Sequence, residues 1–208
     1  MEADWEVEIG ADAAVIDSTW SGLVDLERNP SRIAEISEAA NFPPLADTLL
    51  LLNAPAFHNV PSRAQGKMQE GVRTIKCDLW PVTDLDPDEM EATPATSLFG
   101  IAAYIDLLPR ETHVFPDLAA AERWARQVVL ELRSIPAHAA RVDLVIRRAV
   151  SSSHEGLGIT AYITGCGATS TAAYASFGRA LQLFAETLAA STISGSVNPW
   201  PPIRKTIQ

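Results

Sequence analysis

The residues with the clearest capacity for chemistry are aspartates inside segments that have the alternating hydrophobicity of β-strands, namely Asp17, Asp78, Asp106 and Asp143. Aspartate is depleted in strands, so its recurrence in these segments needs an explanation, either structural or functional. Carboxylates that converge can share a proton or hold Mg²⁺ or Ca²⁺. Aspartates on a sheet more often pair with arginine or lysine at the surface, so we assign no catalytic residue and no metal ligand. A small-molecule enzyme with a carboxylate cluster, with or without a metal, is the alternative.

The histidines and cysteines show no spacing that defines a site. No two histidines have the i, i+4 spacing that places two ligands on one helix face, and all fall in loops or at element ends: His58, His113, His138 and His154. Cys77 and Cys166 lie far apart and form no Cys-x-x-Cys motif. Two isolated cysteines favour reduced thiols in a cytoplasmic protein.

Two short polar segments contain part of a known motif. The segment from Gly165 to Ser170 joins a predicted strand to a predicted helix, where backbone N–H groups can bind an anion. It lacks the lysine of a P-loop, so a tight turn capped by Thr169 or Ser170 is favoured. Residues 151–155 hold a serine, a histidine and a glutamate, but a polar hairpin loop explains them better than a catalytic triad. We expect no cofactor.

The elements that position these residues are strands interrupted by a few helices. Alternation predicts strands at 5–9, 15–26, 74–80, 99–108, 141–150 and 157–165, with the first two and the last two forming hairpins. Helices are predicted to begin near residue 30 and after Pro43-Pro44, and to span 116–134 and 169–190.

This order predicts an α+β fold with a single, largely antiparallel sheet of about six strands and helices packed on one face. From residue 99 onward the order matches most of a ferredoxin-like unit, which needs one more strand from the N-terminal half. We predict one domain over residues 1–194, an extended Pro-rich tail at 195–208, and loops at 53–72 and 83–96.

Composition argues against several classes of partner. The formal net charge of −10 opposes binding to nucleic acid, which depends on lysine and arginine. No apolar stretch reaches the ~18 residues of a membrane-spanning helix. The N-terminus lacks the features of a signal peptide, so a cytoplasmic protein is expected.

The most informative pattern is the side of each predicted strand opposite its apolar side, which we call the open face. Side chains alternate across a strand, so these residues share one surface if the strands pair regularly. Tyrosine and tryptophan beside arginine are enriched in interfaces, although a solvated face with cross-strand ion pairs is the simpler explanation. The candidate binding residues are Asp17, Lys76, Asp78, Trp80, Tyr104, Asp106, Asp143, Arg147 and Tyr162.

The sequence therefore favours a non-enzymatic binding or accessory protein that uses the open face, either for a protein partner or for self-association as a homo-oligomer. An enzyme would require two of the carboxylates to meet in a concave site. An acidic inhibitor that masks a basic partner is a third hypothesis, suggested by the net charge.

Overall fold

The structure is a computed structural model that describes residues 1–10, 13–54, 71–83, 85–86, 90, 98–110, 112–152 and 154–191. Its strands are β1 (Glu2–Glu8), β2 (Ile16–Asp17), β3 (Val72–Val82), β4 (Phe99–Pro109), β5 (Ala140–Ser151) and β6 (His154–Gly167). Its helices are the 3-10 helix η1 (Pro30–Glu35), α1 (Ser37–Asn41), α2 (Pro43–Asn53), α3 (Leu118–Arg133) and α4 (Ser170–Ser191). Most of the two predicted loops, and the predicted tail at 195–208, lie outside the described residues.

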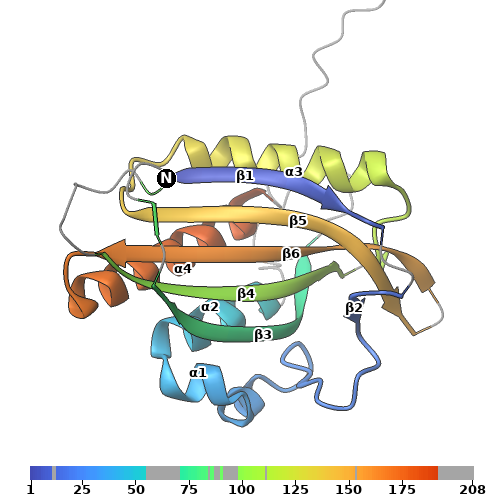
Figure 1. Cartoon of the computed structure of the whole chain (residues 1–208). Coiled ribbons are helices and arrows are strands. Elements are labelled where there is room, and N and C mark those ends of the chain that lie inside the picture. The colour runs from blue at the N-terminus through green and yellow to red at the C-terminus, as the bar shows by residue number, and fades with distance from the viewer. Residues whose placement is uncertain are drawn as a thin grey trace, which may run out of the picture.

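All six strands form one sheet (Figure 1). Five of them follow the order β1-β5-β6-β4-β3, and β2 pairs with β5 beyond the end of β1. The pairs β3–β4, β4–β6 and β5–β6 are antiparallel, whereas β1 and β2 both run parallel to β5. The α+β class with one six-stranded sheet is therefore confirmed, but the sheet is mixed rather than largely antiparallel.

The hairpin predicted between residues 5–9 and 15–26 is wrong. The Asp17 carboxylate accepts hydrogen bonds from the backbone N–H and the hydroxyl of Thr19, both at 2.7 Å. An aspartate that bonds to the backbone two residues later favours a turn, so β2 ends after two residues. The Val15 N–H donates to the Arg148 carbonyl instead, which keeps this segment on the same edge of β5 as β1.

Helices α2, α3 and α4 lie behind the sheet in the view of Figure 1, so one face of the sheet carries them. Helix α3 begins where Asp117 accepts the N–H of Ala120 at 2.7 Å, and it buries Ala121, Ala125, Val128, Val129 and Leu132. Helix α4 crosses β6 at Gly165, where a Cβ atom would lie 2.3 Å from the backbone nitrogen of Phe177. The main core fills the space between sheet and helices.

A second, smaller core lies on the other side of the sheet, at one end. Its buried members come from five segments of the chain: Ile16, Ile75, Leu108, Val114 and Ala149. Gly158 provides the room, because a Cβ there would lie 2.9 Å from the Ile16 Cδ1 atom. The Trp20 indole N–H donates to the Ile75 carbonyl at 3.3 Å. This bond holds the segment that follows β2 over the end of the sheet where the second core lies. This second core therefore covers one end of the open face.

Candidate binding face

The register of the strands arranges the open face in rows that cross the sheet. One row runs Asp4, Asp143, Tyr162, Tyr104 and Asp78, from β1 to β3. The adjacent row runs Glu6, Val145, Thr160, Asp106 and Lys76. Residues of one row lie on neighbouring strands about 4.8 Å apart, so each side chain contacts its neighbours in both directions.

Aromatic side chains form a band on this face that runs from the edge strand β3 across β4 to β6. The ring centroids of Trp80 and Tyr104 are 6.2 Å apart, and those of Tyr104 and Tyr162 are also 6.2 Å apart. The Arg147 guanidinium lies 5.6 Å from the centroid of Tyr162 and extends the band to β5. All four side chains are half-buried, so their edges and parts of their faces remain accessible. Tilted aromatic pairs at such distances are mutually attractive.

In the adjacent row, the three residues between Glu6 and Lys76 are buried. Asp106 is only 5% exposed, and its carboxylate accepts a 2.6 Å hydrogen bond from the Thr160 hydroxyl. Burial raises the pKa of Asp106, and the hydrogen bond from Thr160 and the charges of Arg147 and Lys76 oppose that effect only in part. Asp106 is thus a buried acid whose neighbouring cations only partly offset the effect of burial.

The cations of the open face are held by neighbours on the same face. Arg147 donates two hydrogen bonds to the Glu8 carboxylate, at 2.5 and 3.1 Å. A hydrogen bond with Tyr104, followed by the charge of that phenol, raises the pKa of Lys76. The Lys76 ammonium also lies 5.5 Å from the Trp20 ring centroid. Each cation therefore contacts an aromatic ring, an acid, or both.

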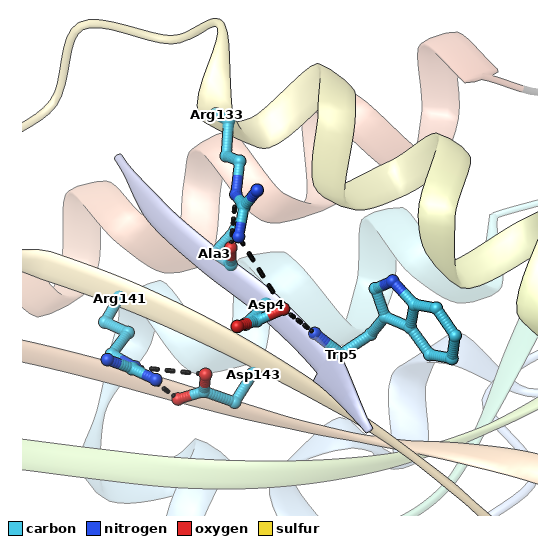
Figure 2. A network of polar contacts seen from close by, with 6 residues as sticks. All are labelled: Ala3, Asp4, Trp5, Arg133, Arg141 and Asp143. Atoms are coloured by element: carbon cyan, nitrogen blue, oxygen red, sulfur yellow. Dashed lines mark hydrogen bonds and ion pairs between the residues drawn. The ribbon is translucent and has the colours of Figure 1, made fainter. Parts of the chain in front are cut away.

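The margin of the face at β1 has its own polar network (Figure 2). Arg141 donates from Nε to both carboxylate oxygens of Asp143, at 2.8 and 3.0 Å. The Asp4 carboxylate accepts the N–H of Trp5 at 2.8 Å and lies 3.6 Å from Arg133 of α3. Arg133 also donates to the Ala3 carbonyl at 2.7 Å. These contacts connect β1 to α3 and neutralise part of the negative charge of β1.

The structure brings together all the predicted face residues except Asp17. Ile16 pairs with Ala149 and packs in the second core on the open-face side, so Asp17 points to the opposite side of the sheet. The prediction assumed that Ile16 faces the helices. Sequence reasoning also missed the acidic side of β1, although the alternation of Trp5 and Val7 with Glu6 and Glu8 carries that signal.

Asp78 and Asp143 do not converge, and Asp17 points to the other side of the sheet. Asp78 and Asp143 lie in one row but three strand spacings apart, or about 14 Å. Within the part of the chain that the structure describes, no three histidine, cysteine, aspartate or glutamate side chains come close enough to hold a metal ion. His113 and His154 do meet, with ring centroids 5.5 Å apart, at the outer end of the β5–β6 hairpin.

Comparison of the chain with family models, curated proteins and solved structures finds no match. None of the described helices combines the length and the apolar character needed to cross a membrane. The function must therefore be argued from the face itself.

Proposed function

We propose that this protein is a non-enzymatic binding protein whose open face recognises a positively charged surface of a protein partner. The observation that carries the proposal is the band of Trp80, Tyr104 and Tyr162, which runs from the β3 edge to β6 in the middle of the sheet, with acidic residues of β1 along the opposite margin. Half-buried aromatic side chains beside charged residues at the rim are typical of protein interfaces.

The charge balance of the face indicates the sign of the partner. Its cations already contact acids or aromatic rings of the same face, as Arg147 does with Glu8 and Arg141 does with Asp143. The acids outnumber the cations, and they include Glu2, Glu6 and Asp78 in addition to those in ion pairs. Complementary charge guides association and excludes partners of the same sign. A basic partner surface fits this face, and the net charge of −10 adds to the attraction.

A selection from random peptides tests the proposal, because the sequences of the bound peptides are not fixed in advance. Biotinylated protein would select from a library of random dodecapeptides displayed on phage, and the recovered peptides would be titrated against variants. We expect peptides rich in lysine and arginine, whose affinity falls about tenfold in Trp80→Ala and in Glu6→Lys. Tyr174→Ala is the matched control, because Tyr174 is an exposed aromatic residue on α4. Peptides without positive charge, or equal binding to Trp80→Ala, would contradict the proposal.

Self-association through the same face is the main competing outcome. Light scattering over a concentration series would measure the mass of wild type and of Trp80→Ala. A wild-type dimer that Trp80→Ala dissociates would make a second copy the occupant of the face and replace the basic partner. A monomer at every concentration supports a different partner.

An enzymatic role is the second candidate, and Asp106 is the observation that favours it. A buried carboxyl group with a raised pKa has the properties of a general acid. The role would also need an accessible path from solvent to the carboxyl group, because Asp106 is buried. Turnover of any compound in a metabolite screen, abolished by Asp106→Asn, would favour the enzyme over the binding protein.

Two finer predictions belong with this proposal. The ferredoxin-like interpretation of the C-terminal half is supported by the strand order β5-β6-β4-β3, in which β3 supplies the additional strand from the N-terminal half. Location in the cytoplasm is supported by the free thiols of Cys77 and Cys166.

A further inference from the structure

Among the described residues, side chains cap the outer edge of β1 at Ala3 and Trp5. β1 is the last strand on its side of the sheet, and Ala3 and Trp5 use outward backbone groups to bond Arg133 and Asp4 (Figure 2). Backbone groups of alternate residues point to the same side of a strand, so Val7 also turns its N–H and C=O away from β5. In the described part of the chain, no strand pairs with β1 on that side.

The opposite edge of the sheet is protected along β3. The Thr74 N–H donates to Asn53 of α2 at 3.1 Å, and the Leu79 N–H donates to Asp78 at 2.7 Å. Pro81 has no N–H to offer. Capped backbone groups and proline are the means by which proteins prevent a further strand from adding to an edge. Among the residues that the structure describes, none caps the outward backbone groups of Val7, and the apolar side chains there are partly exposed, with Val7 38% and Ile9 41% exposed.

A hollow lies next to this edge, on the outer side of α3. Its volume is about 240 Å³, and its lining is Ala119, Glu122, Arg123, Arg126, Gln127 and Leu130. Arg126 connects the hollow to β1, because its guanidinium lies 5.9 Å from the centroid of the Trp5 ring. Leu130 is 59% exposed, so the hollow offers apolar contact. An uncapped edge beside a helix provides both backbone pairing and a place for side chains of an added strand.

We propose that an extended segment of the basic partner adds to the sheet as a strand along the Val7 edge of β1, with alternating basic and apolar side chains. The inference deepens the proposed function and rests on it, because it names how the partner docks. On the open-face side, the added side chains lie beside Glu6 and Glu8, which favours lysine or arginine. On the other side they lie beside Val7 and towards α3, which favours apolar residues.

The same pattern argues against a second copy of the chain as the occupant. An antiparallel pair of β1 strands centred on Val7 would place Glu6 of each copy opposite Glu8 of the other. Like charges directly opposite each other destabilise a strand pair. The acidic alternation of β1 thus selects a strand of opposite charge.

The test uses the full chain and a heptapeptide of alternating lysine and valine, Lys-Val-Lys-Val-Lys-Val-Lys, with blocked ends. A matched control peptide carries N-methyl groups on its valines, so that it keeps the charge and most of the side-chain character but loses strand hydrogen bonds. The protein variants are Val7→Pro, which removes the outward N–H, and Val7→Ala, which keeps it. Proline is tolerated on edge strands where the N–H faces solvent, and an unfolding curve checks the stability of the variant.

We expect the unmodified peptide to slow hydrogen exchange of the Val7 amide about tenfold at saturation and the Trp5 amide, already bonded to Asp4, much less. Val7→Pro or N-methylation should weaken binding about tenfold, and Val7→Ala less than about threefold. Binding without protection of Val7, or equal binding by Val7→Pro, would overturn strand addition while leaving the proposed function standing. Absence of binding by the peptide would also overturn strand addition, and the library selection would decide the proposed function independently.

Discussion

The Thr160 hydroxyl donates its hydrogen bond to the Asp106 carboxylate from a position with no solvent exposure, one strand away in the same row of the sheet. Lys76 and Arg147 act on Asp106 through their charge. Burial nevertheless dominates and raises the pKa of Asp106 above its ordinary value of 3.8. Thr160 therefore donates to a carboxyl group whose charged form is disfavoured by burial.

The first prediction concerns the pH dependence of stability. Because its pKa is higher in the folded than in the unfolded chain, Asp106 contributes stability that is fully present below pH 3.8 and is lost as pH rises through the folded-state pKa. Asp106→Asn, which cannot ionise, should therefore be more stable than wild type at neutral pH, and the difference should shrink as the pH falls towards 4. Urea unfolding over a pH series measures this difference.

Asp78→Asn is the control for that series, since Asp78 is exposed on the neighbouring strand. It removes one carboxylate from the same face and leaves the buried carboxylate of Asp106 in place. A loss of more than about 2 kcal/mol in Asp106→Asn at neutral pH would contradict the prediction. Such a loss would mean that Lys76 and Arg147 hold the ionised carboxylate in a favourable buried ion pair.

The second prediction separates the hydroxyl of Thr160 from its shape. Thr160→Val keeps the volume but removes the donor to Asp106, so the free energy of unfolding at neutral pH should fall by about 1–3 kcal/mol. Thr160→Ser keeps the hydroxyl and should lose only about 1 kcal/mol, from one buried methyl group. Chemical denaturation of both variants gives the comparison. A Thr160→Val variant as stable as Thr160→Ser would show that the hydrogen bond contributes little.

How much of this face could be predicted depends on which physical signal each part carries. Strand alternation has a period of two, so the positions of Asp78, Tyr104 and Tyr162 on one surface follow from the sequence once their strands are recognised. The periodic apolar stripe of α3 likewise identified that helix. The binding role of the face stays a prediction.

The pairing of strands carried no such local signal. Whether β1 pairs with β2 or runs parallel to β5 depends on contacts between residues more than a hundred positions apart, such as Glu8 and Arg147. We predicted that Ile16 faces the helices, but it packs in the second core on the open-face side. Asp17, the next residue, therefore points to the opposite side from the one predicted. An apolar residue in a strand indicates burial but does not indicate which side of the sheet buries it.

The third prediction tests the approach of α4 to the sheet. At Gly165 a Cβ atom would lie 2.4 Å from the Phe177 Cα atom, and helix backbone has no flexible end that could move aside. Gly165→Ala should therefore lower the free energy of unfolding by about 3 kcal/mol or more. Gly10→Ala is the matched control, because nothing lies within 4 Å of its Cβ position. Thermal unfolding of the two variants decides; equal melting temperatures would mean that α4 does not pack this closely.

The last prediction concerns the thiol of Cys77, which lies on β3 next to Asp78. Burial, followed by the charges of Glu38, Asp78 and Asp106, raises its pKa from 9.0 to about 12. At pH 8 only about one thiol in ten thousand is then the reactive thiolate in the folded chain, against about one in ten in the unfolded chain. Alkylation by iodoacetamide should therefore be roughly a thousandfold slower in native buffer than in urea. Mass spectrometry of the peptide that contains Cys77 follows the rate, and the peptide of the fully buried Cys166 serves as the internal reference. Rapid native labelling of Cys77 alone would show that β3 separates from the helices readily, and that the edge beside the aromatic band is less rigid than its packing indicates.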